Sequence, residues 1–371
     1  MSLNYTPLQK YRTFLITIIL LIVSLLLRFW LTADQIEMYY SRGIFVAIRT
    51  VWDTLATWLP IPLFYLFWLF VLTLVLGLYR AAKRVKGSFW LKLGFVTRQL
   101  IQFAAILVIV FLWGWGYNYG RVAVEEKMGF APYSLTKQEL QNRVFGETAA
   151  LSALRNQVVG SDTNALNKQH FPVKWEASIR PLLVSALKKE GYPTSGRVRG
   201  RQLWPKGILL RWSTAGVYWP WAGEGNIDGG LHPLQIPSVM AHEMAHGYGF
   251  GDEGTCNFWA FLAGQHTNEP VLQYAFRLAY WRRIASRFRR ADPEAYDQFR
   301  KTQLDRGIIN DLRAIYANNN KYPDLLPAVR DATYNAYLKA QGIEEGILNY
   351  GRVVQLVEGH FTFNISISNS L

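Results

Sequence analysis

Cysteine is almost absent from this sequence: Cys256 is the only one among 371 residues. A single thiol cannot form a disulfide within the chain, so the cysteine content excludes neither an oxidising nor a reducing compartment. Cys256 lies in the apolar stretch CNFWAFLA, where a small buried side chain is a simpler interpretation than a metal ligand. Internal repeats and low-complexity tracts are lacking as well.

Acidic residues are scarce: 26 of them face 40 lysines and arginines, which gives a formal net charge of +14. The basic excess has two main sources, the segment 80–98 and the stretch YWRRIASRFRR at 280–290. Neither is accompanied by a nucleic-acid-binding module, so we expect no nucleic-acid partner. A solvated helix face, or one near anionic lipid headgroups, accounts for the second stretch.

Long apolar runs, in contrast, are frequent near the N-terminus. Residues 13–32, 59–79 and 99–117 each approach the roughly 20 apolar residues that a membrane-crossing helix requires. Their only charged residue, Arg28, lies near the end of its run and can reach the headgroups. A cleavable signal peptide is the alternative for the first run, but no small-residue cleavage site follows it. We therefore predict a membrane domain, residues 1–120, with three transmembrane helices in a lipid bilayer.

Basic residues in the short loops predict the orientation of these helices. The loop between the first and second runs carries only Arg42 and Arg49, together with acidic residues. The loop between the second and third carries Arg80, Lys83, Arg84, Lys86, Lys92 and Arg98. This asymmetry places the N-terminus in the cytoplasm and residues 121–371 on the outer face of the membrane.

The most informative motif is HEMAH at 242–246, within PSVMAHEMAHGYGFGDEGTCN. On a helix, the four-residue spacing places His242 and His246 on one face, so both imidazoles can bind one ion. Glu243 lies beside them and can handle a proton without being a ligand. Both histidines could instead be ordinary helix residues, but the chain has only six histidines, and two at this spacing around a glutamate are unexpected by chance.

A third ligand must come from beyond the glycines that end this helix. Asp252 is one candidate, if the segment is an HExxHxxGxxD pattern. Glu253 is the other, if it opens a new helix with Asn257 one turn along to hold a ligand histidine. We favour Glu253, because a Glu followed by Asn at four residues has helical spacing and no Met-turn is evident.

The Glu253 interpretation resembles the gluzincin peptidases, whose third zinc ligand is a Glu in an E-x-x-x-D/N helix downstream of HExxH. The segments GVYWP at 216–220, GEGNI at 223–227, HEMAHGYGFGDE at 242–253 and NYGRVVQL at 349–356 also resemble a bacterial membrane family, domain of unknown function 3810. The chain departs from that family at 254–256, where Gly-Thr-Cys replaces the more usual Asp-Glu-Ala. The resemblance implies a peptidase-like site in a bacterial inner membrane, with Glu253 as the acid that still matches.

The rest of the chain predicts an α+β fold in which residues 121–371 form a helix-rich, zincin-like domain with a small β-sheet. Thr136 and Glu139 have capping-box spacing at a helix start, and Pro181 should break or kink a helix at 173–190. The alternating, glycine-punctuated region 206–230 predicts strands, with 223–227 as a candidate edge strand for substrate or as a strand that covers the core. The final third predicts helices at 270–290, 293–316, 326–341 and 346–358.

Together these features predict a membrane-anchored zinc metallopeptidase that hydrolyses peptide bonds of a peptide or protein substrate. His242, His246 and Glu253 would bind Zn²⁺, and Glu243 would act as general base. An oxyanion donor could come from Tyr350, Arg352 or His360. The alternative is a metal-stabilised envelope scaffold or binding protein without turnover. Three ligands rather than four, and the presence of Glu243, favour catalysis.

Overall fold

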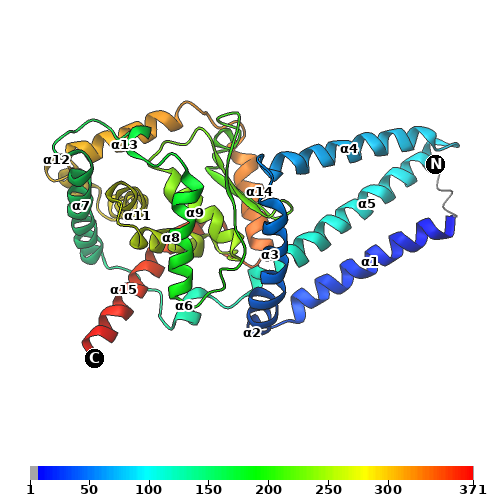
Figure 1. Cartoon of the computed structure of the whole chain (residues 1–371), viewed down its shortest axis with the longest axis horizontal. Helices are drawn as coiled ribbons and strands as arrows, with labels where there is room; N and C mark the ends of the chain where they lie inside the picture. The colour runs from blue at the N-terminus through cyan, green and yellow to red at the C-terminus, as the bar shows by residue number, and fades with distance from the viewer. Residues whose placement is uncertain (1–6, 371) are drawn as a thin grey trace. The chain divides into compact units, whose positions relative to one another are not determined.

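The computed structural model describes residues 7–370, which divide into two compact units. The first consists of the chain up to Arg121 together with Trp219–Gly223, and the second of Val122–Tyr218 and the chain from Glu224 onward. The first unit contains α1 (Pro7–Trp30), α2 (Ala33–Gln35), the π-helical stretch η1 (Ile36–Ile44), α3 (Phe45–Ala56), α4 (Leu63–Arg84), α5 (Phe89–Gly114) and the 3-10 turn η2 (Gly116–Gly120). Figure 1 shows these elements in blue and cyan.

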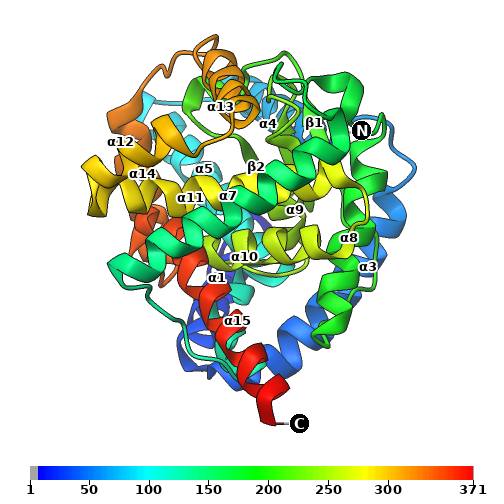
Figure 2. The same cartoon turned by 90° about the vertical axis from the view of Figure 1, so that its left-hand side faces the viewer.

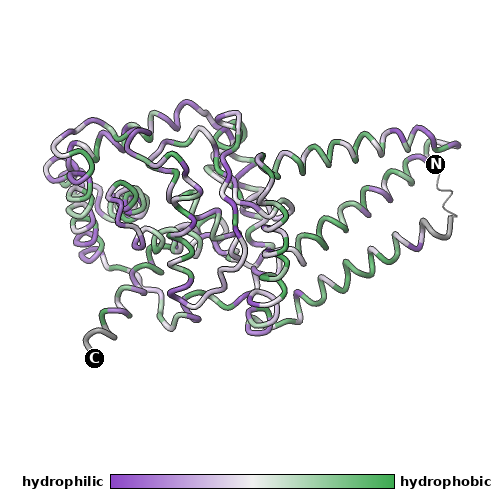
Figure 3. The backbone as a smooth tube through the Cα atoms, in the orientation of Figure 1, coloured by the Kyte–Doolittle hydropathy of each residue, from purple (hydrophilic) through white to green (hydrophobic). Residues whose placement is uncertain are grey.

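Three of these helices, α1, α4 and α5, are long and apolar enough to cross a membrane. They are largely hydrophobic along their length in Figure 3, and most of their apolar side chains are exposed, as lipid-facing residues are. The predicted apolar N-terminal helices are therefore confirmed, with shifted bounds. The second begins at Leu63 rather than 59, because Pro60 and Pro62 precede it.

Polar contacts inside the first unit satisfy its charged side chains. Glu37 accepts hydrogen bonds from Arg42 at 2.7 Å and Arg121 at 2.8 Å. Arg28 donates to the carbonyl of Gly116 at 2.9 Å. The segment 33–56 is thus helical and internally paired.

Residues Trp219–Gly223 belong to this first unit. Trp219 and Trp221 pack in an aromatic cluster with α4, and the Trp221 ring stacks on Phe67 at 5.9 Å. The indole of Trp221 donates to the carbonyl of Leu107, and that of Trp52 to the carbonyl of Ala222. These contacts tie residues 219–223 to the apolar helices of the unit.

The second unit is mostly helical. Its helices are α6 (Val124–Met128), α7 (Lys137–Val159), α8 (Trp175–Lys189), α9 (Ile236–Gly247), α10 (Glu253–Ala263), α11 (Pro270–Ala291), α12 (Pro293–Thr302), α13 (Arg306–Asn319), α14 (Pro327–Ala340) and α15 (Val353–Ser370), with 3-10 turns η3 (Lys168–His170), η4 (Leu210–Trp212), η5 (Gly264–His266) and η6 (Gly346–Arg352). The predicted Thr136–Glu139 capping box is present at the start of α7.

Two helix predictions need correction. The expected helix 293–316 is two helices, because Asp305 caps a new start by accepting from the backbone of Gly307 and Ile308. Pro181 does not break its helix, which continues through that residue as α8, and a kink there stays a prediction. Pro181 and Ala177 are both exposed, so the carbonyl that loses its intrahelical donor can be hydrated.

The small sheet has the strand order β1-β3-β2, with β1 (Gly200–Leu203), β2 (Gly216–Trp219) and β3 (Glu224–Asp228). β1 pairs in parallel with β3, and Gly200 lies opposite Gly225. The small sheet was expected. Of the two interpretations of 223–227, the edge strand is wrong and the strand within the core agrees with the structure, because β3 is central and buried throughout. β1 lies before the region predicted as strands and covers the edge that β3 would otherwise expose.

The core of the second unit surrounds α9 and α10, which pack against one another. α7 and α11 run side by side over them (Figure 2), and α8 packs against both α9 and α10. Trp259 on α10 and Trp281 on α11 are among the largest fully buried side chains. The segment containing the HEMAH motif is therefore held inside the buried core of the unit.

Candidate metal centre

The histidine pair lies on α9. This helix begins at Ile236 and has Pro237 in its first turn, where proline is favourable. The spacing of four residues places both imidazoles on one face, with ring centroids 4.9 Å apart. The Nε2 atoms of His242 and His246 lie 3.2 Å from each other. Both residues are buried.

A glycine turn ends α9 and fixes the orientation of His246. Gly249 has a φ of +91°, a left-handed conformation that glycine adopts without strain. The turn brings the carbonyl of Phe250 to 2.7 Å from Nδ1 of His246. That contact makes Nδ1 a hydrogen-bond donor and leaves the lone pair of Nε2 for a cation.

Glu253 is the first residue of α10 and points back at the histidines. Its Oε2 atom lies 2.9 Å from Nε2 of His242 and 3.4 Å from Nε2 of His246. Asp252 instead caps α10 by accepting from the backbone of Thr255, and it also contacts Asn349 and Arg352. The structure thus brings Glu253 to the histidines and directs Asp252 elsewhere.

Asn257, one turn along α10, holds the second imidazole. Its side-chain oxygen lies 3.1 Å from Nδ1 of His242, so this ring also presents Nε2 to the centre. The expectation that this residue would contact a ligand histidine agrees with the geometry. Each imidazole is therefore oriented by an acceptor on its far side.

His242, His246 and Glu253 form a buried group that could hold a metal ion. Their three inward atoms are separated by 2.9, 3.2 and 3.4 Å. A tetrahedral site with metal–ligand bonds of about 2.0–2.1 Å has ligand–ligand separations of about 3.3 Å. Three buried lone-pair donors at such separations repel one another unless a cation lies between them. The donor set therefore fits a tetrahedral metal ion.

Electrostatics favour an ionised Glu253. Burial alone would raise the pKa of this carboxyl, but the charges and hydrogen bonds of His246 and His242 outweigh burial and hold its pKa well below the usual range. Burial raises the pKa of Glu243 to about 8. The two carboxyl groups of the centre thus have opposite protonation tendencies.

Glu243 stands apart from the three converging side chains. Its carboxylate accepts a hydrogen bond from the backbone N–H of Tyr218 on β2. A Cβ at Gly216 would lie 2.6 Å from its Oε1, and one at Gly225 would lie 2.9 Å from its backbone. Only glycine at these two strand positions lets the α9 helix approach the sheet so closely.

Two tyrosines complete the surroundings of the centre. The hydroxyl of Tyr334 on α14 donates to Oε1 of Glu253 at 2.6 Å and lies 3.1 Å from the hydroxyl of Tyr350. The Tyr350 ring stacks on His242, with centroids 6.0 Å apart. Sequence reasoning missed Tyr334, which lies 81 residues from Glu253 and has no motif around it.

The other expected oxyanion donors lie elsewhere. Arg352 pairs with Asp252 and Glu125, and His360 packs between Phe130 and Phe258. The structure brings only Tyr350 of the three to the centre.

Cys256 is a buried core residue beside His246. Its sulfur lies 3.3 Å from Nδ1 of His246, the ring atom that faces away from the centre. Burial raises the pKa of this thiol to about 12, which keeps it neutral. Cys256 therefore lies outside the converging group.

Fold and site define a mostly helical protein whose apolar N-terminal helices suggest membrane association and whose buried His-His-Glu group could hold a metal ion. The chain belongs to the protein family of unknown function DUF3810, whose model matches residues 40–357. That range includes α9, α10 and both tyrosines of the centre. Neither a curated protein nor a solved structure matches the chain.

Proposed function

We propose that this protein is a membrane-anchored, zinc-dependent metallopeptidase with a zincin-like second unit. The observation that carries the proposal is the convergence of His242, His246 and Glu253, with Glu243 next to them but outside the group. A structural metal site needs no additional buried carboxylate, whereas a hydrolytic site needs a base.

Zinc bound at this centre would supply a Lewis acid and acidify a water molecule. In its ionised form, which prevails above its pKa of about 8, Glu243 would accept the proton of the attacking water and deliver it to the leaving amine nitrogen. Its backbone partner on β2 keeps the carboxylate in place for both transfers.

The tyrosines have separate tasks in this proposal. Tyr334 orients Glu253 through its 2.6 Å hydrogen bond. Tyr350, whose ring stacks on His242, would donate from its hydroxyl to the oxygen on which negative charge develops.

We further propose that the second unit lies outside the cytoplasm of a bacterial inner membrane. The support is the basic segment 80–98 between α4 and α5, which the positive-inside rule assigns to the cytoplasm. Peptide or protein substrates would then be encountered on the outer side.

A second candidate function is a metal-stabilised scaffold without turnover. Its support is burial, because His242, Glu243, His246 and Glu253 are each at most 7% exposed. A metal bound by buried side chains of this kind would stabilise the folded unit.

The decisive experiment uses the full chain in detergent or nanodiscs, with metal content and hydrolysis of a fluorogenic peptide library measured on the same samples. Wild type should carry one zinc and cleave peptides. Glu243→Gln should keep the metal and lose at least about a hundredfold in turnover, because general-base catalysis contributes about 10²–10⁴.

The matched control is Glu294→Gln on the exposed first turn of α12, which should behave as wild type. Wild-type turnover in metal-loaded Glu243→Gln would falsify the peptidase proposal. Metal binding that raises the melting temperature without any peptide cleavage would support the scaffold instead.

A further inference from the structure

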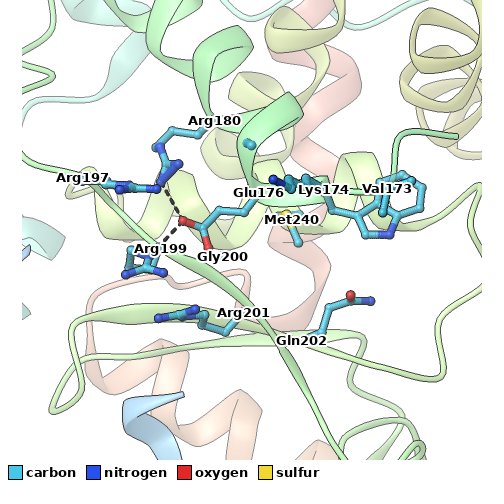
Figure 4. A pocket seen from close by; sticks show the side chains of 12 residues that line it. Val173, Lys174, Glu176, Arg180, Arg197, Arg199, Gly200, Arg201, Gln202 and Met240 are labelled. Carbon is cyan, nitrogen blue, oxygen red and sulfur yellow. Dashed lines mark hydrogen bonds and ion pairs between the residues drawn. The ribbon is translucent and has the colours of Figure 1, made fainter. Parts of the chain in front are cut away.

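A separate cavity of about 340 Å³ lies in the second unit, between the start of α8, β1 and α9. Figure 4 shows the side chains that line it, including Met240 from α9. The lining contains a single acidic residue, Glu176. Its basic residues are Lys174, Arg180, Arg197, Arg199 and Arg201.

The one carboxylate is shared between two guanidinium groups. Oε1 of Glu176 accepts from Arg180 at 2.7 Å and from Arg199 at 2.9 Å. In Figure 4 both bonds are drawn, and Arg197 lies next to Arg180 on the same side of the carboxylate. Within the lining of the cavity, one negative charge is therefore set against five positive charges.

A second carboxylate, just outside the lining, faces one of the other cations. Arg201 is 3.9 Å from Glu224, at the limit of an ion pair. Within residues 7–370, neither Arg197 nor Lys174 forms an ion pair, and both are exposed. The cavity is consequently a region of uncompensated positive potential.

The clustering already disfavours the charged form of the arginines. Burial lowers the pKa of Arg180, and the charges of Arg197 and Arg199 lower it further although Glu176 opposes them. Burial and the charge of Arg199 likewise lower the pKa of Arg201. An anion in the cavity would relieve this repulsion.

The backbone at the start of α8 also adds positive potential to the cavity. α8 begins at Trp175. Its N-cap residue is Lys174, whose side chain has no acceptor, so it does not cap the N–H groups of the first turn. Trp175, Glu176 and Ala177 line the cavity, so the positive end of a 15-residue helix borders it. Such a helix start favours phosphate groups.

We propose that this cavity binds a ligand through a phosphate group carrying two negative charges. Guanidinium forks match phosphate oxygens bidentately, and several surround the cavity. A volume of about 340 Å³ holds a phosphate with a small attached group and lies at the lower end of the range for ligand sites. The group could come from an anionic lipid headgroup or from a soluble phosphate ester.

The test uses the full chain in phosphatidylcholine nanodiscs, titrated calorimetrically with pyrophosphate and separately with dihexanoyl phosphatidic acid. At least one probe should bind to wild type. Arg197→Gln should weaken that binding about tenfold, because a charged hydrogen bond and its Coulomb attraction are lost. Lys174→Gln should weaken it in the same direction.

Arg289→Gln, on the exposed face of α11, removes the same charge away from the cavity and should leave binding unchanged. Tighter binding of the lipid probe identifies a headgroup site, and tighter binding of pyrophosphate a soluble ligand. The proposal is overturned if neither probe binds, or if Arg197→Gln and Arg289→Gln lower the affinity equally. Equal melting temperatures of the variants show that the fold is intact.

Discussion

Two buried polar clusters of the second unit differ in how their charges are balanced. In the first, Asp311 on α13 accepts hydrogen bonds from Arg155 on α7 at 3.0 Å and from Tyr274 on α11 at 2.6 Å. Its other oxygen accepts from the backbone of Leu166 at 2.7 Å. This cluster contains its own counter-charge, and its carboxylate oxygens all have donors.

The second cluster is the candidate metal centre, where two imidazole nitrogens and one carboxylate oxygen converge on a single point. Nε2 of His242, Nε2 of His246 and Oε2 of Glu253 point at one another, while the donor sides of both rings face outward. Both clusters are buried to a similar degree. Burial of charge is therefore no sign of function in itself, whereas the convergence of three possible metal ligands on one point marks a candidate site.

The largest effect that this comparison predicts is on stability. Asp311→Ala should lower the free energy of unfolding by about 3–5 kcal/mol, because Arg155 is left charged and unpaired in the core. The loss should be the same with and without a metal chelator, since the cluster needs no ion. Chemical denaturation of the full chain in detergent, with and without EDTA, measures both.

A matched control removes a carboxylate that is largely hydrated. Asp331 pairs with Arg330 at 2.7 Å, but its side chain is 56% exposed. Asp331→Ala should therefore change the unfolding free energy by less than about 1 kcal/mol. If Asp311→Ala lowered the free energy of unfolding as little as this control, the Asp311 cluster would not stabilise the core through its own ion pair.

The next effect is on metal affinity. Asn257→Ala removes the acceptor that orients the ring of His242, while the three inward atoms remain. Loss of such an orienting partner typically weakens metal binding about 10–100-fold. Competition with a zinc-selective chelator measures the change.

Asn142→Ala, on an exposed position of α7, is the corresponding control and should leave zinc affinity unchanged. If Asn257→Ala left the zinc affinity unaltered, packing alone would hold the His242 ring, and the contact with Asn257 would not orient it.

The features that could be predicted from the sequence depend on neighbouring residues. The three apolar helices, the Thr136–Glu139 cap and the helix with His242 and His246 on one face all follow from spacings within a few residues. The meeting of Glu253 and Asn257 with the histidines also follows from helical spacing, once the glycine turn is recognised.

The features that escaped prediction depend on residues far apart in the chain. β3 is central only because β1, some 25 residues earlier, pairs with it in parallel, as Gly200 opposite Gly225 shows. Tyr334 reaches Glu253 from 81 residues away, and Asp311 is 156 residues from Arg155. No local sequence pattern predicts such pairings, because they depend on how whole strands and helices pack together.

The smallest effect is the stability change at Asp252, and it separates the two adjacent acids at the start of α10. Asp252→Ala removes an N-cap whose oxygen lies 2.6 Å from the Thr255 nitrogen, which should cost about 1 kcal/mol of stability and leave one zinc per chain. Glu253→Ala should instead abolish stoichiometric zinc, because one of three converging ligands is lost. Zinc analysis of both purified variants, next to denaturation curves, distinguishes cap from ligand. Zinc loss in Asp252→Ala with zinc retention in Glu253→Ala would reverse the assignment. Asp252 would then be the metal ligand, and Glu253 would have only a structural role at the start of α10.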